Sequence, residues 1–111
     1  MPGTFELKKA KNGEIYFNLK AANGEVILTS ETYRRKSNAL NGIEAVKKNA
    51  TLDIRYATKM NKAGKALFVL RAGNHQVLGQ SEGYSSESAC AAGMSSVKKN
   101  APSAKIHDLT I

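Results

Sequence analysis

Residues 15–30, IYFNLKAANGEVILTS, decide the fold of this 111-residue chain. The first half of this stretch alternates apolar with polar side chains, the period of two that is typical of a half-buried strand. Asn23-Gly24 follows and favours a two-residue type I′ hairpin turn, because both central residues of that turn need positive φ. The stretch is therefore predicted to form a β-hairpin. Its register would pair Ala21 with Val26, Leu19 with Leu28 and Phe17 with Ser30.

The flanking residues extend this hairpin into a larger unit. Phe5 and Leu7 alternate with polar residues and precede a turn at Lys11-Asn12-Gly13, which predicts another strand. Ser37 is expected to cap a helix that ends near Asn49. The segments after the two predicted helices, residues 52–54 and 105–109, are apolar enough to add one strand each. One unit thus has the order β-β-β-α-β. The apolar side of its helix carries Ala39, Gly42, Ile43 and Val46.

The whole unit is repeated, because residues 5–50 recur without a gap as residues 56–101. Units of this size are near the lower limit of independent stability, so we expect one shared core. We predict a single domain, residues 1–111, made of two repeats at about residues 5–54 and 56–109. The predicted fold class is α+β: a pseudo-twofold domain with a mainly antiparallel sheet and both helices on one face. In the second hairpin His75 replaces the turn glycine, and we expect the turn to survive with Gly73 recruited and a looser register.

The repeated motifs resemble the YegP-like family of small uncharacterised bacterial and archaeal proteins. The resemblance extends over residues 5–101. It rests on the hairpin Phe-x-Leu-Lys-Ala-x-Asn-Gly, a recurring Tyr, a Ser-rich helix start, and Gly42-Ile43 or Gly93-Met94 before Val-Lys-Lys-Asn-Ala. It implies a β3-α-β unit that occurs in tandem or as two subunits of one assembly, and it implies no established activity, substrate or cofactor. His75 and Gly79, which stands where the first copy has Leu28, depart from the pattern.

Few residues could carry catalytic or metal chemistry. Cys90 is the only cysteine, and it falls on the predicted core side of the second helix, where a thiol is usually inert. His75 and His107 have no partners at metal-ligand spacing apart from the adjacent Asp108, whose side chain would project away in a strand. We therefore predict no enzyme activity, no catalytic residue, no cofactor and no metal site.

The chain is basic, with a formal net charge of +8 and a pI of about 9.8. Its lysines and arginines are scattered over turns and helix ends, which favours a solvated surface over a nucleic-acid patch. No apolar run approaches the ~20 residues of a membrane helix, and the first residues do not resemble a secretory signal. We expect a cytoplasmic protein without a membrane partner, and a monomer with internal pseudo-symmetry.

Several polar and small residues recur in both copies. Gly42 and Gly93 each cost about 1 kcal/mol inside a helix, so each helix is expected to press onto the sheet there, or the two helices to cross near the symmetry axis. Tyr33 and Tyr84 are expected to staple the helix starts. The repeated pairs Ser30-Glu31 and Ser81-Glu82 are expected to cap backbone groups or to form salt bridges. The repeated pairs Lys47-Lys48 and Lys98-Lys99 are expected to lie at the negative ends of the helix dipoles.

The predicted register turns one further set of residues away from the helices. An open sheet face that mixes apolar and basic groups could hold a peptide, a second protein or unstacked bases, unless sheet twist, tails or self-association cover it. The sequence thus leaves the function unknown and favours a non-catalytic small binding or structural module, with a nucleic-acid-binding module or a protein–protein interaction module as alternatives. The candidate binding surface consists of Tyr16, Lys20, Ile27, Leu67, Val69, Arg71 and Leu78.

Overall fold

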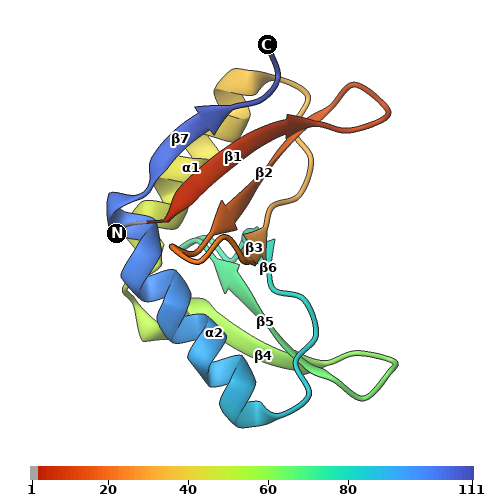
Figure 1. Ribbon diagram of the computed structural model, residues 1–111, viewed down its shortest axis with the longest axis vertical. Coiled ribbons are helices and arrows are strands. Elements are labelled where there is room, and N and C mark those ends of the chain that lie inside the picture. Colours follow the sequence, from red (N-terminus) through yellow and green to blue (C-terminus); the bar gives the residue numbers. More distant parts are fainter. Residues whose placement is uncertain (1–2) are drawn as a thin grey trace.

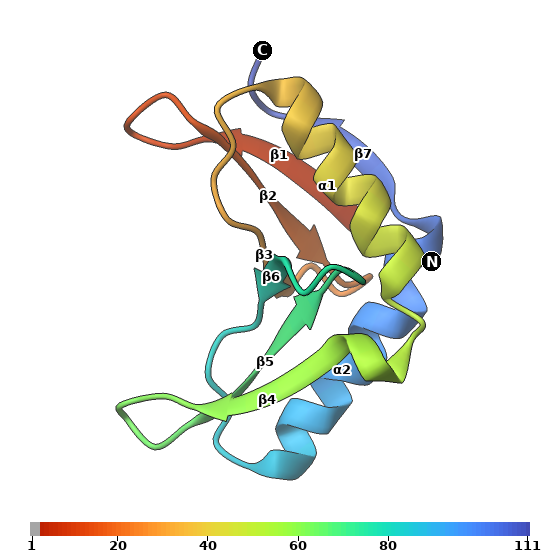
Figure 2. The same ribbon diagram turned by 180° about the vertical axis from the view of Figure 1, so that it is seen from behind.

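Seven strands form one sheet, and two helices cover one of its faces (Figures 1 and 2). The computed structural model describes residues 3–111. The first repeat contains β1 (Thr4–Lys9), β2 (Ile15–Lys20), β3 (Val26–Thr29) and α1 (Lys36–Asn49). The second contains the 3₁₀ helix η1 (Asp53–Arg55), β4 (Tyr56–Met60), β5 (Ala66–Arg71), β6 (Val77–Gln80), α2 (Glu87–Asn100), the 3₁₀ helix η2 (Ala101–Ser103) and β7 (Lys105–Asp108).

The strand order is β4-β5-β6-β3-β2-β1-β7, so a pseudo-twofold axis passes between β3 and β6. All neighbouring strands are antiparallel except β1 and β7, which are parallel. The predicted α+β fold with two tandem repeats and two helices on one face is therefore confirmed.

The buried side chains of both repeats form a single hydrophobic cluster between the sheet and the helices. On α1 the buried residues are the four that the helical spacing predicts. On α2 they are Cys90, Gly93, Val97 and Asn100. Two aromatic stacks, one in each repeat, join this cluster to the partly buried tyrosines: Phe17 lies against Tyr33, and Phe68 lies against Tyr84.

The turn in the first hairpin differs from the predicted type I′ turn. Gly24 donates its amide proton to the Ala21 carbonyl at 2.9 Å, and Gly24 rather than Asn23 has positive φ. These features define a three-residue loop, a type I turn followed by a left-handed glycine, which generates a bulge in the flanking strand. Leu19 still pairs with Leu28, but Lys20 instead of Ala21 pairs with Val26, because the register shifts between Leu19 and Lys20.

The second hairpin keeps the same turn without a glycine. His75 adopts φ 72° and donates its amide proton to the Ala72 carbonyl at 2.9 Å. The register is equivalent to that of the first hairpin, with Leu70 opposite Gly79 and Arg71 opposite Val77. The expected loosening of the register and recruitment of Gly73 are therefore wrong, because the histidine itself accepts the left-handed conformation.

We predict that replacing His75 with glycine stabilises the protein. A side-chained residue in the left-handed region is strained, and the added freedom of glycine in the unfolded chain offsets part of the gain, leaving about 0.5–1 kcal/mol. Thermal unfolding should show a melting temperature about 3–6 °C higher. The control Gln76→Gly changes a neighbouring residue that lacks positive φ and should lower the melting temperature. A lower melting temperature for His75→Gly would contradict the strain.

Two expected helix and strand boundaries are also corrected. Ser37 does not cap α1, which begins at Lys36 after Arg35 and has no side-chain cap. In α2 the cap is Ser86, whose hydroxyl accepts a hydrogen bond from the Ala89 amide at 3.1 Å. Residues 52–54 do not add a strand, because the chain turns through η1 and enters β4 directly, whereas the segment after α2 does form β7.

This difference breaks the symmetry at the two ends of the sheet. β7 covers the outer edge of β1, but within residues 3–111 no strand covers the outer edge of β4. Lys36 at the start of α1 contacts β7 through an ion pair with Asp108 at 2.7 Å. The hydrogen bond from Lys36, followed by those from Thr110, lowers the pKa of Asp108 to about 2.

We predict an acid-sensitive docking of β7 from this lowered pKa. The contribution of Asp108 to stability is present above its ordinary pKa near 3.8 and is lost as the pH falls through about 2. An NMR titration of the Asp108 carboxyl carbon should show the low midpoint, and Lys36→Met should move it upward. A midpoint that stays the same in Lys36→Met would show that the ion pair does not form.

Candidate functional site

The structure separates the seven residues of the candidate binding surface. Tyr16, Lys20, Leu67 and Arg71 are half-buried. Ile27, Val69 and Leu78 are 5%, 0% and 4% exposed, so they offer no contact area to a partner. Ile27 and Leu78 belong to the hydrophobic core, which contradicts their expected position on the open face. The bulges next to the two turns explain the difference, because an extra residue reverses the alternation of side chains along a strand.

The basic charge on the sheet face of the first repeat is partly neutralised. Lys20 and Lys8 both form ion pairs with Glu6, at 3.1 and 3.6 Å. Partial burial raises the pKa of Glu6. The hydrogen bond and charge of Lys20, together with Lys8, lower this pKa by more than burial raises it, so the net pKa lies below its ordinary value. Glu6 is thus a carboxylate at neutral pH, and it reduces the attraction of this face for polyanions.

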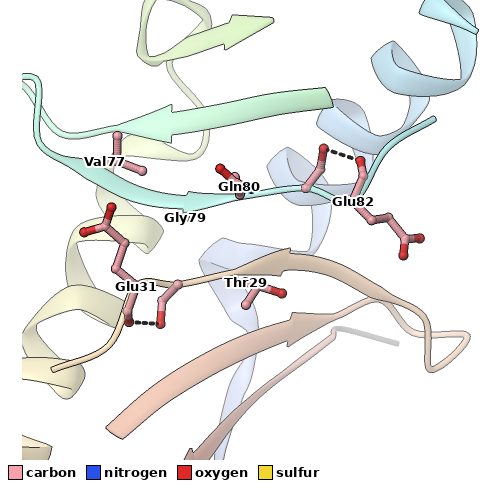
Figure 3. Close-up of a pocket in the computed structure, with 8 residues that line it drawn as sticks. Thr29, Glu31, Val77, Gly79, Gln80 and Glu82 are labelled. Carbon is pink, nitrogen blue, oxygen red and sulfur yellow. Dashed lines mark hydrogen bonds between the residues drawn. The ribbon is translucent and has the colours of Figure 1, made fainter. Parts of the chain in front are cut away.

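A pocket of about 300 Å³ lies where β3 meets β6 (Figure 3). Glu31 follows the end of β3 and Glu82 follows the end of β6, while Thr29 and Gln80 form the centre of this pocket. Neither glutamate forms an ion pair with a described residue. The pocket can therefore present two carboxylates to solvent.

The serines beside this pocket serve the backbone. Ser30 donates its hydroxyl proton to the Glu31 carbonyl at 2.8 Å and accepts a hydrogen bond from the Phe17 amide. Ser81 makes the equivalent contacts with Glu82 and Phe68. The prediction that these serines cap backbone groups is confirmed, and their hydroxyls are not available as nucleophiles.

Burial favours the neutral forms of the Cys90 thiol and of three tyrosine hydroxyls. Cys90 is buried, and burial followed by the charge of Glu87 raises the pKa of its thiol. Burial likewise raises the pKa of Tyr33, Tyr56 and Tyr84. Across the described residues 3–111, no three His, Cys, Asp or Glu side chains lie together as a metal site would require. No helix in this part of the chain has the length and apolarity to cross a membrane.

The lysines at the helix ends are also used within the fold. The ammonium group of Lys47 lies 6.0 Å from the centre of the Phe5 ring, and that of Lys98 lies 5.5 Å from the centre of the Tyr56 ring. Lys98 in addition forms an ion pair with Asp53. These lysines lie in the last turns of α1 and α2, as predicted.

Within residues 3–111 the outer edge of β4 is unpaired and lies beside exposed apolar side chains. Met60 is 66% exposed on β4, and Ile54 just before it is 81% exposed. A hollow of about 450 Å³ lies beside this edge and beneath the start of α2. Its walls consist of Thr58, Lys59, Met60, Ala66, Glu87 and Cys90.

Sequence reasoning did not identify this edge, because it expected residues 52–54 to form a strand that runs on into the opening strand of the second repeat and it predicted no strand order. The signal was nevertheless present. The repeat aligns residues 105–108, which form β7, with residues 54–57, all of which the chain uses for η1 and the beginning of β4. The same residues cannot both form β4 and cover its edge.

Two repeats, one continuous pseudo-twofold sheet and two helices define a class of small tandem-repeat α+β proteins. The chain belongs to the DUF1508 family, a domain of unknown function, which matches it twice, at residues 10–56 and 61–108. Together with the similarity to a YegP protein described next, this match confirms the expected resemblance to YegP-like proteins.

Close relatives of the chain are likewise uncharacterised. The UPF0339 protein YegP of Yersinia pestis is 51% identical over 98% of this chain and 97% of its own length. A UPF0339 protein from the ptx operon 5′ region of Stutzerimonas stutzeri is 54% identical over 96% of both chains.

Two solution NMR structures share the fold. A UPF0339 protein of Shewanella oneidensis superposes with a TM-score of 0.92 at 49% identity, covering 99% of this chain and 93% of its own. The yegP protein of E. coli superposes with a TM-score of 0.94 at 43% identity, covering 99% and 95%. It is described as a protein of unknown function.

Proposed function

We propose that this protein is a non-catalytic protein-interaction module that binds an extended segment of a partner along the outer edge of β4. The observation that carries the proposal is the unpaired edge of Tyr56–Met60 beside the 450 Å³ hollow. An edge strand presents a row of backbone donors and acceptors, and an added strand can use them while its side chains enter an adjacent hollow.

The composition of the edge favours a different protein over a second copy of this chain. Lys59 is exposed next to the last residue of β4, and a lysine on an edge strand disfavours pairing of identical edges. We accordingly propose a cytoplasmic monomer. Sedimentation should give a mass near 11.9 kDa, and a stable dimer would contradict this part of the proposal.

A proline at position 58 tests the use of the edge. Leu7 is equivalent to Thr58, and its carbonyl accepts a hydrogen bond from Leu109 in the segment that covers β1. The amide of Thr58 should therefore point outward, so that Thr58→Pro removes an outward donor and leaves the pairing with β5 intact. The matched control Thr58→Val keeps the amide.

The wild type, Thr58→Val and Thr58→Pro are each used as bait in quantitative affinity capture from lysate. We expect the proteins that bind to the wild type and to Thr58→Val to be absent from the Thr58→Pro sample. An NMR amide spectrum should show that the proline variant remains folded. Equal capture of the same proteins by all three would overturn the proposal.

Nucleic-acid binding is a second candidate, favoured by the position of the hairpin tips. The β1–β2 and β4–β5 hairpins extend toward the same side of the molecule (Figures 1 and 2). Their turns carry the exposed residues Lys11, Lys62 and Lys65. Two basic tips on one side could contact a phosphate backbone without reading its sequence.

Fluorescence polarisation with random RNA and DNA at low salt tests this second candidate. Each lysine changed to glutamine at the tips should reduce the salt slope by about 0.7–0.9. Lys48→Gln on α1, away from the tips, is the control and should leave the slope unchanged. A lack of binding at low salt would exclude this candidate.

A further inference from the structure

We infer that the segment bound at β4 runs parallel to β4 and places a lysine or arginine against Glu87. This inference rests on the proposed function and specifies the partner that the β4 edge selects. It draws on the internal repeat, because the structure already contains one example of a strand docked at the equivalent edge. That example is β7 on β1.

β7 provides the geometry of docking. It runs parallel to β1, with Ile106 opposite Phe5 and Asp108 opposite Leu7. The next residue, Leu109, donates its amide proton to the Leu7 carbonyl at 2.9 Å. The repeat aligns Phe5 with Tyr56 and Leu7 with Thr58. A segment bound to β4 in the same way would place one residue opposite Tyr56 and another, two positions later, opposite Thr58.

The charge at the start of the helix differs between the two halves. In the first half the first residue of α1 is Lys36, and it forms an ion pair with Asp108 of β7. In the second half the first residue of α2 is Glu87, and it lines the hollow beside β4. A residue in the position of Asp108 would therefore face a carboxylate. The complementary side chain there is lysine or arginine, and an aspartate would be repelled.

β7 also indicates which residue should lie opposite Tyr56, because Phe5 of β1 is the equivalent of Tyr56. Ile106, the residue of β7 opposite Phe5, is aliphatic. The segment that fits is thus extended, with an aliphatic residue opposite Tyr56 and a basic residue two positions later. The protein's own β7 carries Asp108 at that place, so the edge discriminates against the same strand from a second copy.

Two peptides test the inference directly. The first has the sequence of residues 103–110, SAKIHDLT, and the second carries Asp108→Lys. In titrations followed by NMR, the Asp108→Lys peptide should bind the wild type about fivefold more tightly than the unchanged peptide. The shifts should be confined to residues 56–60 and the residues around Glu87 and Cys90.

Charge reversal on the protein supplies the second half of the experiment. Glu87→Lys should reverse the preference, so that the unchanged peptide binds about fivefold more tightly. Glu44→Lys makes the same change of net charge on the exposed side of α1 and should leave the preference of the wild type intact.

The outcomes separate the inference from the proposed function. Shifts at residues 56–60 with equal affinity for both peptides, unaffected by Glu87→Lys, would overturn the charge selection and leave edge binding supported. Shifts elsewhere, or none with either peptide, would overturn both. A spin label at one end of the peptide shows in which direction the peptide runs along β4. An antiparallel orientation would overturn the parallel one inferred here.

Discussion

Replacing Gly79 with leucine is expected to destabilise the protein by about 3 kcal/mol and to lower its melting temperature by roughly 12–24 °C. Gly79 is the equivalent of Leu28 in the second repeat, and both lie beside the pseudo-twofold axis. A Cβ atom at Gly79 would lie 2.9 Å from Leu28 Cγ and 3.0 Å from the Thr29 carbonyl oxygen. The space beside the axis therefore holds one leucine, and the second repeat must have a smaller residue at the equivalent position.

A leucine exchange across the axis is the decisive control. Leu28→Gly alone leaves a cavity and should also destabilise the protein. The double variant Leu28→Gly with Gly79→Leu moves the one leucine to the other side and should recover a large part of the stability. Gly73→Leu, where a Cβ would meet only the end of the Arg55 side chain at 3.4 Å, should change the stability by no more than about 0.5 kcal/mol. A double variant no more stable than Gly79→Leu would contradict the one-leucine explanation.

The second large effect is expected at the helix glycines, where Gly42→Val and Gly93→Val should each cost about 2–3 kcal/mol. A Cβ at Gly42 would lie 2.5 Å from the Tyr33 hydroxyl oxygen, 2.9 Å from its Cζ and 3.2 Å from Phe17 Cε2. The Tyr33 ring cannot move aside easily, because it stacks on Phe17 with ring centres 6.3 Å apart. Gly93 faces Tyr84 in the same way, with the Tyr84 Cζ at 2.7 Å.

Urea denaturation of the two valine variants checks this prediction. Asn41→Val adds the same side chain to the exposed side of α1 and is the matched control. Gly42→Ala is a milder change that should lower the free energy of unfolding by less than Gly42→Val. Adding Tyr33→Phe, which removes the hydroxyl, should recover part of this lost stability, so the effects of the two changes should not be additive. If both valine variants unfold at the wild-type urea concentration, the close packing of helix on tyrosine is not required for stability.

These contacts also decide between the two explanations that the sequence offered for the glycines. The closest atoms to both glycines belong to tyrosines at the sheet, and none belongs to the other helix. Each helix therefore presses onto the sheet through a tyrosine, and the glycines do not mark a helix crossing. The rings of the repeated tyrosines fill the space that the missing side chains of these glycines leave, whereas the expected stapling of the helix starts stays a prediction.

The candidate site was predictable only in part. The sequence identified the sheet face opposite the helices, but it placed Ile27 and Leu78 there, and both are buried in the core. The reason is the turn: Asn23-Gly24 is compatible with two hairpin loops that differ by one residue in register. A one-residue difference moves a side chain from one face of the sheet to the other. The β4 edge was not predicted, because the fate of residues 52–54 depends on where the chain must go after α1.

The sequence alone determined the repeat, the hairpins and the buried side of α1, because periodicity and turn residues act over a few neighbouring positions. Only the tertiary structure decided which strand edge is covered, that the axis accepts one leucine, and which turn residue takes positive φ. Those features depend on contacts between residues that are distant in the chain, such as Leu28 with Gly79 and β7 with β1. A gapless duplication specifies two similar halves, but a single chain has one C-terminal strand and one axis, so their packing cannot be fully symmetric.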